Sequence, residues 1–434
     1  MADRAEASNP PGLRQAIPVW LKIGLLSFGG PVGQIALMHR ELVERRKWID
    51  DPRFLHALNY CLLLPGPEAQ QLATYVGWLL HGKRGGLIAG TLFVLPGALL
   101  MLGISLAYVT WGTLPLFIAA FDGIKAAVMA IVAIALHRIA SRILKNPIMW
   151  VIAAASFIAI FFLNAPFPII ITAALLIGFL GGKFAPATFI TAPPQHPTHP
   201  LPTTVHLRQI PQPTKRTTLA TLFLWTTIWL APLALCAAIA GPHHLLTQLG
   251  TFFAKAALVT FGGAYAVLPY VGQQTVDVHA WIQPGQMIDG LGLAETTPGP
   301  LILVLQFVGF LAAWNHPGTL PPWLIATTAA ALTTWITFLP GFLFIFAGAP
   351  WMERARQNHR LTAALSAVTA AVVGVMLHLA VWFALHLIRP TPGNIDPFPI
   401  LLATLCFILM RWKNLNIPVI LALAATIGIL RSVF

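Results

Sequence analysis

The chain has 434 residues, of which 57% are hydrophobic and only 9% are charged, with a formal net charge of +13. A soluble domain carries about 25% charged residues, so this composition excludes a soluble globular protein and indicates an all-α polytopic membrane protein. The positive charge lies in short loops between apolar runs, which indicates a topology signal and not a nucleic-acid partner.

Two broken apolar segments open the chain. The first, 15–38, is interrupted by the motif GGP at 29–31, and the second contains the motif PGPE at 65–68. Basic residues flank the first segment, and the basic stretches 39–53 and 81–86 flank the second. Cytoplasmic loops collect Lys and Arg, and one helix cannot join two loops on the same side. We therefore expect each segment to enter the membrane and return as a re-entrant hairpin, with a kinked single crossing as the alternative.

Uninterrupted apolar runs come next, and roughly 20 apolar residues suffice for a helix to cross the bilayer. The expected crossings of the first half lie near 87–109, 115–136, 148–163 and 167–182. The Pro-rich stretch 183–217 has the composition of an extended linker. Residues 218–240 form a further crossing near 219–240 that inverts the second half, and residues 241–434 repeat residues 1–182. The remaining crossings are expected near 323–347, 361–387, 398–411 and 417–433.

The repeat is visible in the motifs of the two halves. KIGLLSFGG at 22–30 recurs as KAALVTFGG at 255–263, and PGP at 65–67 recurs at 298–300, both 233 residues later. Beyond an insertion the spacing becomes 244 residues, which aligns the LPG motif at 95–97 with a second LPG. Several matches in order at a fixed spacing indicate an internal duplication.

Equivalent loops of the two copies differ in charge. The stretch 39–53 holds five Lys and Arg residues, whereas its counterpart, 272–289, holds none and carries Asp277 and Asp289. The order reverses further along, where 110–115 is uncharged and its counterpart is basic. By the positive-inside rule the copies have inverted topology, as the repeats of many secondary transporters do. We expect the N-terminus and the linker in the cytoplasm and the C-terminus outside.

The broken segments carry a candidate anion site. A helix that starts inside the protein presents unpaired N–H groups and the positive end of its dipole, which together bind anions. Glycines let the backbone approach a ligand, and a proline in the first turn costs no hydrogen bond. Lys22 and Lys255, seven residues before each Gly-Gly break, mark a substrate path or else snorkel to the interface. Thr296 and Thr297 add hydroxyl donors.

Acidic residues beside the breaks are candidates for proton coupling. Glu68 follows the first PGP motif, where it either stabilises the helix dipole or binds a proton while an anion occupies the site. Glu295 is a second candidate, and Gln71 shares the helix face of Glu68. Asp122 and Lys125 form an i,i+3 pair that we expect to be mutually neutralising and structural.

The motifs FGGP at 28–31, PGPEAQQLATYVG at 65–77, FGG at 261–263 and TTPGP at 296–300 resemble the chromate transporter family in its long, two-domain form. The resemblance implies a multi-pass protein of the bacterial inner membrane, with a periplasmic C-terminus, that exports chromate by proton antiport and confers chromate resistance. Sulfate, a dianion of the same shape, is the expected competitor. No cofactor or metal is implied; protons and bilayer lipid are partners, and a homodimer is left open.

The family motifs and the residues named above define the predicted site. The substrate-binding residues are Lys22, Gly29, Gly30, Pro31, Pro65, Gly66, Pro67, Gln71, Lys255, Gly262, Gly263, Thr296, Thr297, Pro298, Gly299 and Pro300, with Glu68 and Glu295 for proton coupling. Ala264 and Leu301 of the second copy replace a proline and the glutamate of the first, so coupling falls mainly on the first copy. The alternatives are an uncoupled anion channel or sulfate-type permease and an intramembrane enzyme, although the chain contains no HExxH or GxSxG motif.

Overall fold

The structure is a computed structural model that describes residues 11–28, 30–184, 189, 214–261, 263–352, 359–388, 396–413 and 415–433. The first half contains α1 (Leu13–Leu25), α2 (Gly30–His39), the π-helical turn η1 (Arg40–Arg45), α3 (Asp51–Leu63), α4 (Glu68–Trp111), α5 (Pro115–Ile143), α6 (Pro147–Phe161) and α7 (Phe167–Phe184). The second half comes after α9 (Lys215–Ala240). It contains α10 (Leu245–Val259), α11 (Ala264–Gly272), the π-helical turn η2 (Gln273–Val278), α12 (Pro284–Thr296), the 3-10 turn η3 (Leu301–Leu303), α13 (Val304–Asn315), α14 (Pro322–Met352), α15 (His359–Ile388), α16 (Phe398–Lys413) and α17 (Ile417–Val433). The regular elements of the described ranges are all helical, which confirms the predicted fold class.

The backbone repeats at the spacing found in the sequence. α3 and α12 begin and end 233 residues apart, and so do η1 and η2. Left-handed backbone recurs at the same spacing, at Gly66 and Gly299 (φ 111° and 109°) and at Lys47 and Ala280 (φ 53° and 49°). A positive φ is uncommon for residues other than glycine, so its recurrence at Lys47 and Ala280 identifies equivalent turns. The duplication predicted from the motifs is therefore confirmed.

Each of the four broken segments contains the expected helix break. α3 ends at Leu63 and α4 begins at Glu68, directly after the first PGP motif. The second PGP motif separates α12 from η3 in the same way, and the two FGG motifs separate α1 from α2 and α10 from α11. Gly29 and Gly262, both predicted to bind the anion, lie outside the described residues, as does most of the predicted linker 183–217.

α4 reverses direction within its length. The backbone leaves the helical region at His81 (φ −133°, ψ 15°) and Gly82 (φ 66°, ψ −156°). A Cβ placed on Gly77 would lie 2.6 Å from the Cβ of Ala89, so the helix before the turn packs directly against the helix after it. Small residues at this contact permit a close approach of the two backbones. The basic stretch 81–86, expected as a loop, is thus a tight turn followed by the start of the next helix.

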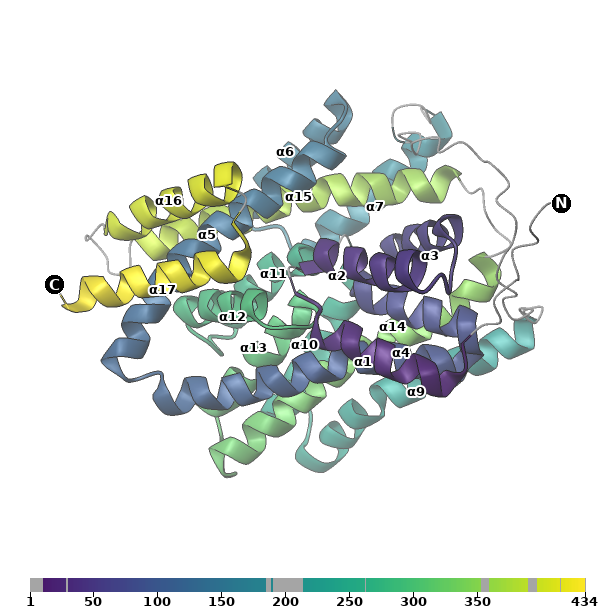
Figure 1. Cartoon of the computed structure of the whole chain (residues 1–434), viewed down its shortest axis with the longest axis horizontal. Coiled ribbons are helices and arrows are strands. Elements are labelled where there is room, and N and C mark those ends of the chain that lie inside the picture. Colours follow the sequence, from purple (N-terminus) through teal and green to yellow (C-terminus); the bar gives the residue numbers. More distant parts are fainter. Residues whose placement is uncertain are drawn as a thin grey trace.

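The two halves exchange their helix partners. α5 of the first half packs against α16 and α17 of the second, while its counterpart α15 packs against α6 and α7 of the first (Figure 1). The contacts are close: Gly123 of α5 faces the backbone of Ala424 in α17, and Gly374 of α15 faces the backbone of Ala153 in α6. The halves therefore form one interlocked helical body.

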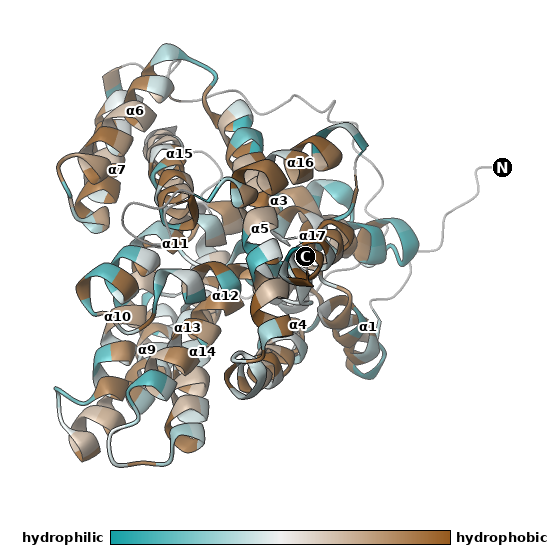
Figure 2. Ribbon diagram, turned by 90° about the vertical axis from the view of Figure 1, so that its left-hand side faces the viewer, coloured by the Kyte–Doolittle hydropathy of each residue, from teal (hydrophilic) through white to brown (hydrophobic). Residues whose placement is uncertain are grey.

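The outer helices are apolar where they face away from the protein, as Figure 2 shows by their hydrophobic colour. Only 6% of the most apolar stretch of α9 is buried against other helices. Six helices are long and apolar enough to span a membrane, namely Glu68–Trp111, Pro115–Ile143, Phe167–Phe184, Lys215–Ala240, Pro322–Trp351 and Ala363–Ile388. An exposed apolar surface of this extent requires a lipid environment, so the chain is a multi-pass membrane protein. α6, α16 and α17, also expected as crossings, have 15, 16 and 17 residues, fewer than the roughly 20 of a typical span.

Three connections between helices lie at one end of the body. Lys83, beside the α4 turn, donates to Thr221 Oγ1 at 3.5 Å, and the indole of Trp351 donates to Thr218 Oγ1 at 2.8 Å. The turn of α4, the start of α9 and the end of α14 therefore lie together. The basic stretches 81–86 and 352–360 follow or form two of these connections, although most of the latter lies outside the described residues.

Cysteine labelling will test the expected side of the basic stretches. In a background where the three native free cysteines are replaced by serine, Arg45→Cys and Lys83→Cys should react with a membrane-impermeant maleimide from the same side of the membrane. Thr113→Cys, in the uncharged connection after α4, should react from the opposite side. Labelling of positions 45 and 83 from opposite sides would eliminate the re-entrant hairpin and leave the kinked single crossing.

Candidate functional site

The four helix breaks meet in two reciprocal pairs. The amide of Gly66 donates to the carbonyl oxygen of Thr260 at 2.7 Å, and the amide of Gly299 donates to that of Ser27 at 2.9 Å. Gly66 and Gly299 are the central residues of the PGP motifs, and Ser27 and Thr260 directly precede the FGG motifs. Each PGP motif is thus hydrogen-bonded to the FGG break of the other copy. We call this assembly the break cluster; its described members are Ser27, Phe28, Gly30, Pro65–Pro67, Thr260, Phe261, Gly263 and Pro298–Pro300.

The residues that accept these two bonds also close the helices before them. The hydroxyl of Ser27 donates to the carbonyl oxygen of Ile23 at 2.6 Å, and that of Thr260 donates to Ala256 at 2.6 Å. Sequence analysis did not select Ser27 or Thr260, although both are hydroxyl residues at the repeat spacing of 233. A hydroxyl at equivalent positions before each FGG motif is the signal that identifies them.

The LPG motifs bring a long helix onto the break of the other copy. A Cβ placed on Gly97 of α4 would lie 2.5 Å from the carbonyl oxygen of Pro298 and 3.0 Å from the Cα of Gly299. On Gly341 of α14, the equivalent Cβ would lie 2.2 Å from Oε1 of Gln70. Both glycines are therefore required for close packing at the break cluster, a role that the sequence alignment of the two motifs did not reveal.

Three buried glutamines surround the PGP motifs. The side-chain amide of Gln71 donates to the carbonyl oxygen of Pro65 at 2.7 Å, and that of Gln34 donates to Gly299 at 2.7 Å. Within the described residues, Oε1 of Gln70 and Oε1 of Gln71 are buried without a hydrogen-bond partner. A buried polar atom left without a partner costs about 1–3 kcal/mol, so the side of the cluster at these amides suits a water or a polar ligand.

Glu68 joins the first copy to the break of the second. It is the first residue of α4, and its carboxylate lies against Gly263: a Cβ placed on that glycine would be 2.7 Å from Oε1 and 3.3 Å from Oε2 of Glu68. Gly263 (φ 92°) immediately precedes α11. The carboxylate is buried and faces the start of a helix, where the dipole stabilises negative charge. The geometry is compatible with both roles considered for Glu68, dipole stabilisation and proton binding.

Glu295 lies in α12, one turn before the second PGP motif. It is 3% exposed, and the hydroxyl of Tyr265 in α11 donates to its Oε1. Thr296 Oγ1 donates to the carbonyl oxygen of Leu293 at 2.8 Å, and Thr297 Oγ1 donates to Ala294 at 3.4 Å. In this conformation both threonine hydroxyl protons are bound by α12 itself, so the donation to an anion that the sequence predicts stays a prediction.

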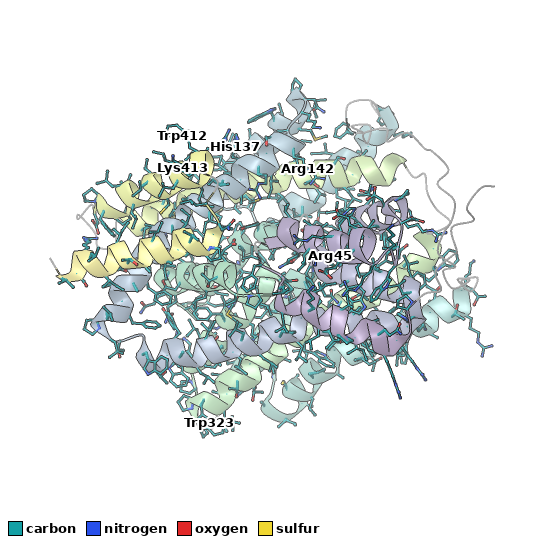
Figure 3. The ribbon with its side chains drawn as sticks, in the orientation of Figure 1. Arg45, His137, Arg142, Trp323, Trp412 and Lys413 are labelled. Carbon is teal, nitrogen blue, oxygen red and sulfur yellow. The ribbon has the colours of Figure 1, made fainter. Side chains whose placement is uncertain are left out.

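Lys22 is held by a buried carboxylate. Its ammonium donates to Glu41 Oε1 at 2.9 Å, and Arg45 and Arg46 bind the same carboxylate at 2.8 and 2.5 Å. Burial raises the pKa of Glu41, but the Lys22 hydrogen bond and the three positive charges outweigh burial and hold the pKa below its ordinary value of 4.5. Arg45 lies over the α2–α3 region (Figure 3). The group carries two net positive charges, and in the second copy Gln274 occupies the place of Glu41 while Lys255 is exposed.

The fold and the break cluster define the class of protein. Discontinuous helices that meet between repeated halves inside an apolar helical body are the construction of secondary transporters. The chain belongs to the chromate transporter family, because the family model described as Chromate transporter matches residues 15–179 and 247–429. This confirms the resemblance found in the motifs, and it places one copy of the family domain in each half.

Relatives of nearly equal length share the family name. A "Chromate transport protein" of Pseudomonas aeruginosa is 33% identical over 433 residues, covering 98% of this chain and 94% of the relative. A "Chromate transport protein" of Cupriavidus metallidurans is 30% identical over 418 residues, covering 96% and 92%. An "Uncharacterized transporter" of Methanocaldococcus jannaschii is 24% identical over 432 residues, covering 99% and 96%. No solved structure matches the chain.

Proposed function

We propose that the protein exports chromate from the cytoplasm across the bacterial inner membrane, driven by the proton motive force, and that this export confers chromate resistance. The observation that carries the proposal is the reciprocal meeting of the four helix breaks, with the Glu68 carboxylate against Gly263. The printed names of the relatives supply the identity of the anion. Sulfate has the same charge and a similar shape, so we propose it as the competitor.

The backbone at the breaks supplies the binding groups in this proposal. α4 and α11 both begin at the break cluster, and the first N–H groups of each helix have no partner within the helix. Helix starts of this kind bind oxyanions through their N–H groups and dipoles. The buried amides of Gln70 and Gln71 can turn an N–H group towards the same ligand. The cation group around Glu41, with two net positive charges, attracts the dianion towards the site.

Electrostatics then determine the role of Glu68. Two unit charges about 4 Å apart repel by about 4 kcal/mol at an effective dielectric constant of about 20, and a dianion doubles that repulsion. Glu68 therefore takes up a proton when the anion binds, so the site holds the two together. Export of a dianion with one proton moves one net negative charge outward, which an inside-negative potential drives by about 2.3 kcal/mol per 100 mV. Antiport, which the family resemblance implied, requires instead that Glu68 release its proton before the anion binds.

Flux measurements in proteoliposomes test the proposal. Chromate movement through the purified protein should respond to an imposed pH gradient at a fixed membrane potential. Acceleration when the chromate-loaded side is the more acidic supports joint movement of proton and anion, and acceleration when that side is the more alkaline supports antiport. Equal rates with and without the gradient would remove proton coupling and leave the uncoupled channel or permease.

The proposed orientation completes the function. We place the N-terminus and the linker in the cytoplasm and the C-terminus in the periplasm, on the basis of the loop charges. The start of α9 and the end of α14 lie at one end of the body with the α4 turn, which supports one common side for the basic stretches. Export then requires the break cluster to open alternately towards the two sides, as in other inverted repeats.

A further inference from the structure

A second cluster of charged groups lies between the two halves. The hydroxyl of Tyr108 in α4 donates to Asp289 Oδ2 of α12 at 2.8 Å. The ammonium of Lys125 in α5 lies 3.8 Å from Asp289 Oδ1 and 3.1 Å from Asp122 Oδ1. The Asp122–Lys125 pair expected from the sequence is thus present, but it has a third member. We call these four residues the interhalf cluster.

Asp289 corrects an expectation from the sequence. Charge counting placed it in a loop outside the membrane, whereas the structure places it inside α12, because this helix already begins at Pro284. Its side chain is only 6% exposed, compared with 52% for Asp122. Asp289 lies eight residues before Thr297, about 12 Å along the helix from the second break at a rise of about 1.5 Å per residue. The interhalf cluster is therefore separate from the break cluster.

The charges of the interhalf cluster do not cancel. Asp289 and Asp122 share the single ammonium of Lys125, so the cluster has one net negative charge when both carboxylates are ionised. Among the described residues, Asp289 Oδ1 has no hydrogen-bond partner and only the distant ammonium. α13, α15, α17 and η3 also pack against α12, and their described residues bring no hydrogen bond or ion pair to Asp289. A buried carboxylate with such incomplete compensation is costly, and adding a proton removes the cost.

We propose that Asp289 is a proton-binding site that controls the contact between the two halves. One proton from water adds to Oδ1, the oxygen without a hydrogen-bond partner, and later leaves from it. Ionised Asp289 attracts Lys125 and so ties α12 of the second half to α5 of the first. Neutral Asp289 keeps the Tyr108 hydrogen bond and leaves Lys125 to Asp122, within α5. The inference requires the interhalf cluster alone and no step of the proposed export.

Infrared difference spectroscopy reads this proton directly. Spectra of the purified full chain in detergent micelles, recorded between acidic and alkaline buffer, should contain a carboxylic-acid C=O band that Asp289→Asn removes. Asp122→Asn, which removes the exposed carboxylate of the same cluster, should retain the band, and so should Glu68→Gln. A spectrum of Asp289→Asn identical to that of the unmodified protein overturns the proposal. Since no transport is measured, this outcome is independent of whether the protein moves chromate.

A second variant keeps the test valid if Asp289→Asn fails to fold. Removal of the positive neighbour in Lys125→Gln favours the neutral acid, so the midpoint of the band's titration should move to higher pH by about 1–3 units. Lys145→Gln, which removes an exposed lysine just after α5, should leave the midpoint unchanged. An unmoved midpoint in Lys125→Gln contradicts the proposal. So does a midpoint that depends on sodium, because the site would then bind a metal cation.

Discussion

Replacing Gly97 by alanine will reduce chromate transport at least tenfold. The new Cβ would lie 2.5 Å from the carbonyl oxygen of Pro298 and 3.0 Å from the Cα of Gly299. Both neighbours are backbone atoms of the second PGP motif, so they cannot move aside as a side chain would. Overpacking of this kind costs about 1–3 kcal/mol, and about 1.4 kcal/mol corresponds to a tenfold change in rate. The strain falls on the bond between Gly299 and Ser27, which joins the two copies.

Gly103 provides the matched control for this variant. It lies in the same helix, and a Cβ placed on it would meet nothing within 4 Å. Gly103→Ala should therefore transport chromate at the unmodified rate. Initial rates in proteoliposomes should be divided by the amount of monodisperse protein, so that loss of folded protein is not mistaken for loss of transport. Equal rates for the two variants would show that the close contact at Gly97 has no part in transport.

The Glu68→Gln variant will lose the pH dependence of anion binding. In the unmodified protein the anion binds with a proton on Glu68, so its affinity should fall about tenfold per pH unit above the titration of this group, as expected for linkage to one proton. Glutamine has the shape of the protonated acid and stays neutral, so the variant should keep the affinity of the acidic limit at every pH. Equilibrium binding of chromate to the purified protein, measured across a pH series, reports this profile without transport.

Two further acids locate the effect. Glu295→Gln removes the other buried carboxylate beside a break, which the Tyr265 hydroxyl already binds, and we expect its binding profile to stay close to that of the unmodified protein. Glu44→Gln removes an exposed carboxylate and should change nothing. A sloping profile in Glu68→Gln together with a flat one in Glu295→Gln would transfer the proton to the second copy.

The helix breaks and the repeat could be predicted because their signals are local. Pro-Gly-Pro inside an apolar run leaves few backbone solutions, and Gly66 and Gly299 adopt the left-handed conformation that only glycine accepts readily. A constant spacing of 233 residues then relates the two copies without any knowledge of contacts. The position of Glu68 at a helix start could be read from the motif alone.

The contacts between copies could not be predicted, because they join residues far apart in the sequence. The bonds from Gly66 to Thr260 and from Gly299 to Ser27 depend on how four segments are brought together. Asp289 was misplaced for a related reason. Counting charges treats every acidic residue between two apolar runs as a loop residue, whereas a helix that begins at Pro284 carries this carboxylate into the body against Lys125.

The exchange of helix partners between the halves has a consequence for biosynthesis. α5 is made early, but the helices that cover it, α16 and α17, are the last that the ribosome delivers. Until then its small-residue face at Gly123, shaped to receive the backbone of Ala424, is covered only by lipid or by the insertion machinery. The first half therefore reaches its final packing only after the stop codon has been read, and a prematurely terminated chain would leave the membrane with an unfinished helix surface.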